Sequence, residues 1–240
     1  MIQESKLKKN AFGWNINVWY RVFHKLSQNK LLHAESNKNL RILEIGATHT
    51  SIVSSMYQGL SAKIEVSCYC AQAFEILNDN VRRLNTGKAV YKTTQTDIFK
   101  LVGNYDVIVM KSVLGGLFRD SRVPSEEANA LISKIVSKNL LPNGILLTLD
   151  NGYSYAEPLL KRFGARKNRW TFFSLGQIQA DEQVGFGVLS CFSFQTRFGL
   201  FGYIIDEFIT YPIDLILSKF FTLRPTVVGS IIINDTVSKD

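Results

Sequence analysis

The nine residues LEIGATHTS, positions 43–51, join an apolar run to a glycine and then to a helix start near Ser51. The apolar run begins at Leu40, and LRILEI over residues 40–45 is typical of a short strand that is buried on both faces. Gly46 opens the loop that follows. A residue without a side chain lets a ligand approach the backbone at this position; alternatively, the glycine only allows the chain to turn. We therefore expect a strand, a tight loop and a helix in succession.

Strand and helix patterns alternate downstream of this stretch. Short apolar runs predict strands, and apolar residues at helical spacing predict helices. Alternation with short links specifies an α/β fold, in which helices cover both faces of a doubly wound, parallel sheet. The expected strands are 64–69, 89–93, 106–110, 144–149, 185–194 and 227–234, and the expected helices are 71–84, 125–139, 159–163 and 174–184.

Two further segments flank this pattern. Residues 14–32 predict a leading amphipathic helix, followed by a polar loop over 34–39. The apolar stretch 198–221 contains Pro212 and several charged residues, so we interpret it as not spanning a membrane. It is either a pair of core helices between the last two strands, or an apolar lid or membrane-facing surface that admits a lipid-linked acceptor.

A chain of 240 residues fits one α/β domain with appendages. We expect a helical cap over 1–39, a ligand-binding half over 40–152, and a C-terminal half over 153–240 that carries a helical insertion at 198–221. No secretory signal is recognised, so the cytoplasm is the expected compartment, with the inner membrane face as a peripheral location. Cys68, Cys70 and Cys191 lack the spacing of a metal site.

The net charge of +8 is unevenly distributed. Residues 1–41 contain eight Lys and Arg against two Glu, a net charge of +6, and a second basic cluster lies within 161–169. Such clusters favour an anionic partner, while the alternative interpretation is that they are solvated helix faces.

The order of several motifs resembles class I S-adenosylmethionine-dependent methyltransferases over nearly the full chain. The matching residues are Glu44 with Gly46, Asp97-Ile98 on the adenine side, the strand YDVIV at 105–109 and the turn LPNG at 141–144. The resemblance implies a Rossmann-like methyltransferase fold with a mostly parallel, seven-stranded sheet, an N-terminal helix and a helical insertion before the last strand. It also implies S-adenosyl-L-methionine as cofactor and no metal.

The resemblance further implies which residues bind the cofactor. There are two departures from the family's pattern: Thr48 and Thr50 stand where further glycines are usual, and Cys68 or Tyr69 replaces the acidic residue that binds the ribose hydroxyls. Lys111 binds the cofactor carboxylate or an acceptor phosphate, or is a strand-end lysine. The implied set is Glu44, Gly46, Ala47, Thr48, Cys68, Tyr69, Asp97, Ile98 and Lys111.

The run MKSVLGGL at 110–117 resembles a subset of bacterial methyltransferases associated with surface-polysaccharide gene clusters. Asp150-Asn151 and Arg169-Trp170 match later motifs of that subset, as does the segment 161–163. The resemblance implies an acceptor hydroxyl, or less readily an amine, on a glycan, nucleotide-sugar or lipid-linked sugar. The acceptor is then a small molecule or glycan, with a phosphate-bearing form among the options.

Methyl transfer depends on alignment and exclusion of water, and a general base would assist a hydroxyl acceptor. Our candidate catalytic residues are His49, Asp150 and Tyr153, and Asp120 is a further candidate for the base. His49 is alternatively a packing residue and Asp150 a turn cap. The aromatic residues of the leading helix, Trp14, Trp19 and Tyr20, either close over the cofactor or are core residues.

Two other functions remain open at this stage. The altered glycine loop and the absent acidic residue suit a non-catalytic methyltransferase-like module that regulates or scaffolds a partner. The basic clusters suit a nucleic-acid methyltransferase, although the strand exit Met110-Lys111-Ser112-Val113 lacks an Asn/Asp-Pro-Pro-Tyr-like motif, which counts against it.

Overall fold

The computed structural model describes most of a sheet and the segments around it. The described residues are 39–47, 60–82, 88–153, 170–178, 183–188 and 225–235, with the shorter pieces Trp19, Val22, Lys25, Leu26, Tyr57, 201–202, 204–210, 212–213 and 216–217. Of the sequence expectations, the loop 48–50, the helix 159–163 and the basic cluster 161–169 lie outside the described residues.

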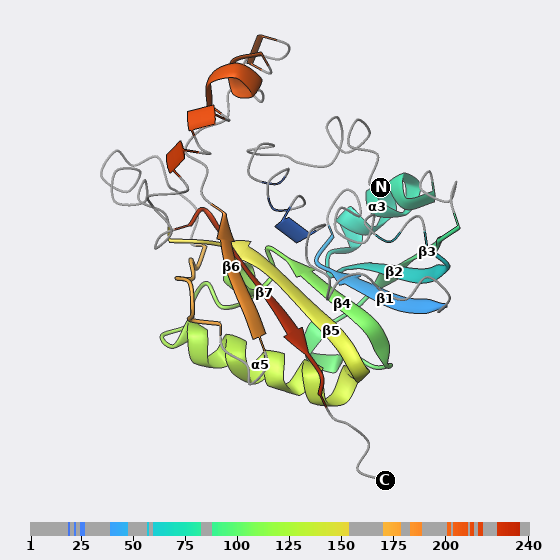
Figure 1. The fold of residues 1–240 in the computed structure, drawn as a ribbon. Coiled ribbons are helices and arrows are strands. Elements are labelled where there is room, and N and C mark those ends of the chain that lie inside the picture. Colours follow the sequence, from blue (N-terminus) through green and yellow to red (C-terminus); the bar gives the residue numbers. More distant parts are fainter. Residues whose placement is uncertain are drawn as a thin grey trace.

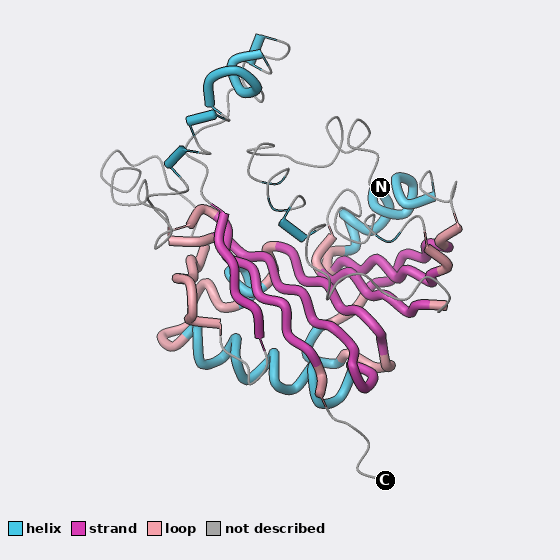
Figure 2. The backbone as a smooth tube through the Cα atoms, viewed as in Figure 1, coloured by secondary structure: helices cyan, strands magenta, loops and turns pink. Residues whose placement is uncertain are grey.

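In the described part of the chain, seven strands form one sheet in the order β3-β2-β1-β4-β5-β7-β6 (Figures 1 and 2). The strands are β1 (Leu40–Ile45), β2 (Ala62–Cys68), β3 (Val90–Gln95), β4 (Tyr105–Lys111), β5 (Leu140–Asn151), β6 (Gln183–Val188) and β7 (Val227–Ile233). The first five run parallel, and β7 lies antiparallel between β5 and β6. The expected Rossmann-like, mostly parallel arrangement is confirmed.

Helices cover both faces of the sheet (Figure 1). On one face, α3 (Ala71–Arg82) contributes Leu77 and Val81 to a buried cluster that also holds Trp19. On the other face, α5 (Pro124–Asn139) contributes Leu131 and Ile132 to a second cluster. Two shorter helices, η3 (Ile98–Lys100) and α4 (Leu114–Leu117), follow β3 and β4.

The central strand β1 shows why the sheet is buried on both sides. Side chains alternate across a strand, so Ile42 faces the α3 side while Leu43 faces the α5 side. Both are essentially inaccessible to solvent, at 0% and 1% exposure. A continuous apolar run is therefore needed here rather than an alternating one.

Where the structure describes them, the expected strands and helices match the observed ones to within two residues at their ends, apart from two differences, and residues 189–194 of the expected strand 185–194 lie outside the described residues. Strand β5 is longer than the expected 144–149, because the turn at Asn143 lies inside it: the N–H of Asn143 donates to the Asn234 carbonyl at 2.8 Å. The helix expected over 174–184 is wrong. Residues 175–178 form turns and bends, Gly176 has φ +86°, and β6 already begins at Gln183.

The amphipathic helix expected over 14–32 is described at four residues, Trp19, Val22, Lys25 and Leu26, and all four are helical. Trp19, Val22 and Leu26 are helical and buried, and they belong to the cluster on the α3 face. These three residues therefore pack on the sheet.

The apolar stretch 198–221 differs from the core-helix interpretation. Its described residues are helical and include the π-helical turn η4 (Asp206–Thr210), but Phe201 and Phe208 are 65% and 74% exposed. In Figure 1 the segment, drawn in orange, stands away from the sheet. Burial of this stretch as core is thus wrong for the described residues. None of the described helices is long and apolar enough to cross a membrane.

Candidate active site at the carboxyl edge of the sheet

The candidate site lies where the strand order changes direction. From β1 the chain builds outward through β2 and β3, and it then returns to place β4 on the other side of β1. In doubly wound sheets, ligands bind outside the carboxyl ends of the strands at such a point. The residues that follow or end these strands are Gly46, Tyr69, Asp97, Lys111 and Asp150.

The turn after β1, formed by Gly46 and Ala47, is tightly held. Both N–H groups donate to the Ser67 carbonyl of β2, each at 3.0 Å. Gly46 has φ +81°, and a Cβ atom there would overlap Cγ2 of Val113. A side chain is thus excluded both by the backbone conformation and by Val113, two residues beyond β4. The glycine requirement at this turn comes from the protein's own packing.

Lys111, at the end of β4, lies in a partly enclosed polar group. Its Nζ atom sits 4.3 Å from the centre of the Trp19 ring, a cation–π contact. Burial lowers the pKa of Lys111, while the carboxylates of Glu44 and Asp150 oppose that shift. Glu44 is itself buried, at 2% exposure. Three of the predicted site residues, from three different strands, are therefore electrostatically coupled.

Asp150, near the end of β5, is fully buried. One carboxyl oxygen, Oδ1, accepts a hydrogen bond from the Gly115 N–H at 3.0 Å. The other, Oδ2, is closed off from solvent and has no hydrogen-bond partner among the residues that the structure describes. Burial raises the pKa of Asp150 to about 7, against the opposing influence of the Gly115 and Leu114 N–H groups and Lys111. Its proton is thus held and released near neutral pH.

The helix α4 connects Asp150 to Trp170. A Cβ atom on Gly115 or Gly116 would collide with the Trp170 ring, so the indole packs directly on the backbone of both glycines. The Trp170 Nε1 atom is buried and, like Asp150 Oδ2, has no partner among the described residues. The glycine pair of MKSVLGGL is therefore explained by the ring that covers it.

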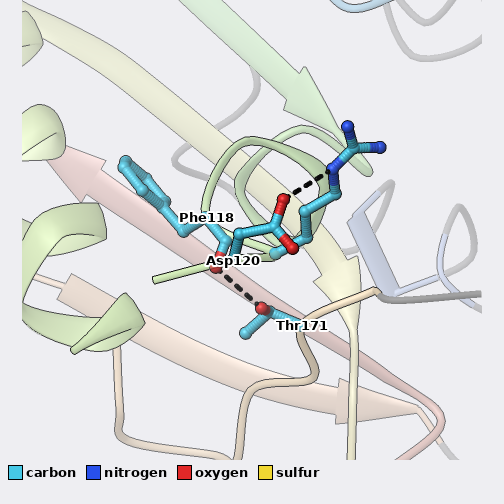
Figure 3. A network of polar contacts seen from close by, with 4 residues as sticks. Phe118, Asp120 and Thr171 are labelled. Atoms are coloured by element: carbon cyan, nitrogen blue, oxygen red, sulfur yellow. Dashed lines mark hydrogen bonds and ion pairs between the residues drawn. The ribbon is translucent and has the colours of Figure 1, made fainter. Parts of the chain in front are cut away.

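Thr171 fastens this segment to α4. Its N–H donates to the Gly115 carbonyl at 3.0 Å. Its Oγ1 donates to the Phe118 carbonyl, also at 3.0 Å (Figure 3). Asp120, a further candidate for the base, lies nearby on the surface and pairs with Arg119 at 3.4 Å, with 64% of its side chain exposed (Figure 3). Asp120 is thus turned to solvent.

The residues at the ends of β2 and β3 are those expected to bind the nucleoside part of the cofactor. Cys68 is buried and its thiol lies 3.5 Å from the Cys70 carbonyl, whereas Tyr69 is 76% exposed. Of these two candidates, Tyr69 is the one that a ligand can reach. Asp97 caps η3, its Oδ1 accepting from the Phe99 N–H at 3.0 Å, and Ile98 is buried beneath it.

The structure places the remaining predicted residues as follows. Thr48 and His49 lie outside the described residues. Tyr153 is half-buried just beyond β5, and its N–H donates to the Phe173 carbonyl at 3.0 Å. The described residues contain no group of His, Cys, Asp and Glu that could hold a metal ion.

No protein-family model matches the chain, and no curated protein sequence matches it either. Solved structures do resemble it. Phosphoethanolamine N-methyltransferase 2 from Haemonchus contortus, in complex with S-adenosyl-L-methionine, has a TM-score of 0.53 at 12% identity, covering 90% of this chain and 52% of that one. This likeness shows a Rossmann-like methyltransferase fold.

Two further solved structures are similar with lower scores. Magnesium protoporphyrin IX methyltransferase from Synechocystis, with bound S-adenosylhomocysteine, has a TM-score of 0.48 at 16% identity, over 90% of this chain and 81% of that one. A S-adenosylmethionine-dependent methyltransferase from Methanosarcina mazei has a TM-score of 0.43 at 19% identity, over 60% and 63% of the two chains. The chain thus spans less than two thirds of the length of the Methanosarcina protein.

Proposed function

We propose that this chain is a S-adenosylmethionine-dependent methyltransferase that acts on a hydroxyl group. The observation that carries the proposal is the set of buried charges at the sheet's switch point: Glu44 and Asp150 flank Lys111 where a nucleotide-like ligand binds in this fold. The likeness of the fold to methyltransferase structures supports the same conclusion.

The residues at this edge fit the cofactor. The exposed ring of Tyr69 offers a flat surface beyond β2, and Asp97 follows β3 with a carboxylate. Two buried carboxyl groups, Glu44 and Asp150, suit a ligand that carries a positive sulfonium, and Lys111 suits its carboxylate. The departure is at Cys68, whose buried thiol cannot replace an acidic ribose ligand.

S-adenosylmethionine, when bound there, supplies an electrophilic methyl group. Transfer to a hydroxyl would form a C–O bond as the S–CH3 bond breaks and S-adenosylhomocysteine leaves, and Asp150 would accept the proton of the hydroxyl at Oδ2. A pKa of about 7 suits this task, because the carboxyl group can both take and return a proton at neutral pH. The acceptor must displace the groups that now close off Oδ2, so access to this atom is part of the proposal.

The acceptor class is the finer part of the proposal. Asp150 Oδ2 has no hydrogen-bond partner among the described residues and could take the proton of an acceptor hydroxyl, which gains more from a general base than a neutral amine does. With the resemblance of MKSVLGGL to polysaccharide-associated methyltransferases, this supports a glycan, a nucleotide-sugar or a lipid-linked sugar as acceptor.

Calorimetric titration with S-adenosylhomocysteine tests the first half of this proposal. We expect the wild type to bind, and Gly46→Ala to bind at least tenfold more weakly because the turn is displaced. Gly176→Ala is the matched control: Gly176 also has positive φ, at +86°, but no atom lies within 4 Å of its added Cβ. Absence of binding to the wild type would remove the enzyme proposal and favour a non-catalytic module.

Methyl transfer itself tests the second half. Radiolabelled S-adenosylmethionine is incubated with matched sugars that differ only in carrying a hydroxyl or an amine at one carbon. We expect label on hydroxyl sugars with the wild type and none with Asp150→Asn. Label on the amines alone, or equal transfer by Asp150→Asn, would contradict the assignment of acceptor and base.

A further inference from the structure

Two buried polar atoms, Nε1 of Trp170 and Oδ2 of Asp150, lie close to the same residue of α4. The Gly115 N–H donates to Asp150 Oδ1 at 3.0 Å, so the carboxyl group lies against the Gly115 backbone. A Cβ atom on Gly115 would collide with Trp170 Nε1, so the indole N–H lies against this glycine as well. Neither Nε1 nor Oδ2 has a hydrogen-bond partner among the described residues, so the two atoms do not bond to each other.

The two atoms are chemically complementary. An indole N–H can only donate a hydrogen bond, and an oxygen of an ionised carboxylate can only accept one. Ser67 and Thr148 also bury a hydroxyl that no described residue satisfies, but a hydroxyl can donate or accept, so these positions specify no ligand. A group that satisfies Nε1 and Oδ2 together must both accept and donate. A hydroxyl group, or a water molecule in its place, does both.

Backbone hydrogen bonds hold the indole in this position. The Thr171 N–H donates to the Gly115 carbonyl, and the Phe173 N–H donates to the Asn151 carbonyl, each at 3.0 Å. Phe173 is fully buried, so the chain that follows Trp170 is anchored both to α4 and to the end of β5. A donor that is fixed in advance needs no reorganisation when charge develops beside it. Trp170 is thus placed as a fixed donor next to the carboxyl group.

We propose that Trp170 selects hydroxyl acceptors against amines, an inference that rests on the proposed function. Its Nε1–H donates to the acceptor oxygen, while Oδ2 of Asp150 accepts from the same hydroxyl. The oxygen bonds to the methyl group as the S–CH3 bond breaks and S-adenosylhomocysteine leaves, and the hydroxyl proton moves to Oδ2. Negative charge grows on the oxygen as the proton departs, and a donor held beside it stabilises that charge.

Lone pairs explain why this donor disfavours an amine. A hydroxyl oxygen has two lone pairs, so it accepts from Nε1–H with one and attacks the methyl group with the other. A neutral amine nitrogen has a single lone pair, and accepting from Nε1–H would withdraw that pair from the attack. An amine that avoids this contact leaves the buried N–H without a partner, which costs free energy. In both cases transfer to the amine is slower.

Methyl transfer by Trp170→Phe tests the selection. The variant keeps an aromatic ring on Gly115 and Gly116 and removes the N–H. The acceptors are UDP-glucose and UDP-glucosamine, which differ at one carbon, and mass spectrometry locates the methyl group. We expect kcat/KM for O-methylation at that carbon to fall at least tenfold and kcat/KM for N-methylation to fall less than twofold. Trp19→Phe, the same change at the other described tryptophan, is the matched control and should leave the ratio of the two unchanged.

The outcomes separate this inference from the proposed function. Equal losses with both sugars in Trp170→Phe would overturn the inference, because they would give Trp170 a packing role or a structural water as its partner. An unchanged ratio would overturn it too. Calorimetric binding of S-adenosylhomocysteine should be the same for Trp170→Phe and the wild type, and absence of binding to the wild type would instead remove the proposed function.

A titration with methanol tests the donor–acceptor pair without methyl transfer. Nitrogen-edited NMR spectra of the labelled full chain are recorded at about pH 8, where most of Asp150 is ionised, and Trp170→Phe identifies the indole N–H signal of Trp170. Methanol can accept from Nε1 and donate to Oδ2, whereas acetonitrile can only accept. We expect a saturable shift of the Trp170 signal with methanol and a shift less than half as large with acetonitrile. Equal shifts, or no saturable shift with methanol, would overturn the proposal, and because no cofactor is present the result is independent of S-adenosylhomocysteine binding.

Discussion

Two places on the same sheet edge are built in opposite ways. At the turn after β1, the N–H groups of Gly46 and Ala47 are both paired, and Val113 fills the space where a side chain would lie. At the end of β5, Asp150 and Trp170 each bury a polar atom that no described residue satisfies. An unsatisfied buried polar atom costs stability. Ser67 and Thr148 also bury a hydroxyl that no described residue satisfies, but Asp150 differs from them because burial raises its pKa to about 7.

We infer from this contrast that the turn after β1 maintains the shape of the site, whereas the end of β5 holds its reactive group. Changes at the turn after β1 should lower both stability and ligand binding, because the turn is held in place by packing. A change that removes the buried charge at the end of β5 should instead raise stability while it removes activity. The following variants test this difference.

Gly46→Ala should have the largest effect. The added methyl group meets Val113 and forces an L-residue into φ +81°, so we expect a loss of about 3–4 kcal/mol in the free energy of unfolding. Gly176→Ala, which has the backbone cost without the collision, should lose about 1–2 kcal/mol. Urea unfolding of both variants measures the difference, and equal losses would contradict the role given to Val113.

Asp150→Asn should stabilise the protein, by an amount that depends on pH. Burial raises the pKa of Asp150 from its ordinary 3.8 to about 7, so the folded state binds the proton more tightly than the unfolded state. The stability from protonated Asp150 is therefore fully present below about pH 4 and is lost as the pH rises through about 7. At pH 8 the variant should be more stable than the wild type by on the order of 2–3 kcal/mol.

Urea unfolding of Asp150→Asn and the wild type between pH 4 and 8 checks this sign. The two stabilities should diverge as the pH rises and run parallel above about pH 8. A wild type that gains stability relative to the variant over this range would show that Asp150 is an ordinary paired carboxylate.

Thr171→Val should have a smaller effect, confined to one hydrogen bond. The variant keeps the shape of the side chain but removes the Oγ1 donor to the Phe118 carbonyl, and the expected loss is about 1 kcal/mol. Thermal unfolding measures it. No change would mean that α4 is not held to the segment of Trp170 through this contact.

Lys111→Met should have the smallest effect of these variants, which is a modest rise in the pKa of Asp150. Removing the cation raises the pKa of Asp150 further, because Lys111 favours the ionised carboxylate. Lys111 is the weakest of the opposing influences, so the pH midpoint of the stability curve should rise by less than about one unit. A downward shift would contradict the electrostatic coupling of these two residues.

The sheet was predictable from sequence because its signal is local. LRILEI over 40–45 gives the bounds of β1 as observed, and the apolar spacing of 125–139 locates α5 to within one residue. The helix expected over 174–184 failed because Gly176 turns the chain, and the Gln177 side chain accepts from the Ser174 N–H at 2.6 Å. That turn has no periodicity by which a sequence pattern could reveal it.

The candidate site was predictable as a set of positions, without the contacts between them. The ends of strands identify Lys111 and Asp150, but the bond from Gly115 to Asp150 joins residues 35 positions apart. The packing of Trp170 on the glycine pair is equally remote in sequence. A Gly-Gly pair after a strand, followed later by a tryptophan, was the only signal, and it has no fixed spacing.

The apolar stretch 198–221 shows the limit of composition. Buried helices and membrane-docking helices share the same residue types, so sequence alone left both interpretations open. The exposure of Phe201 and Phe208 counts against the core interpretation for the described residues, because it reports the direction in which these side chains point.

The central claim is that a nucleoside ligand lies against the turn after β1, at the carboxyl edge of the sheet. Nitrogen-edited NMR spectra of the labelled protein, recorded during titration with S-adenosylhomocysteine, test it most directly. We predict shifts of the backbone N–H signals of Gly46, Ala47, Tyr69 and Ile98, while those of Arg41 and Asp106 at the opposite edge stay unchanged. Shifts confined to the opposite edge, or none at saturating ligand, would contradict the claim.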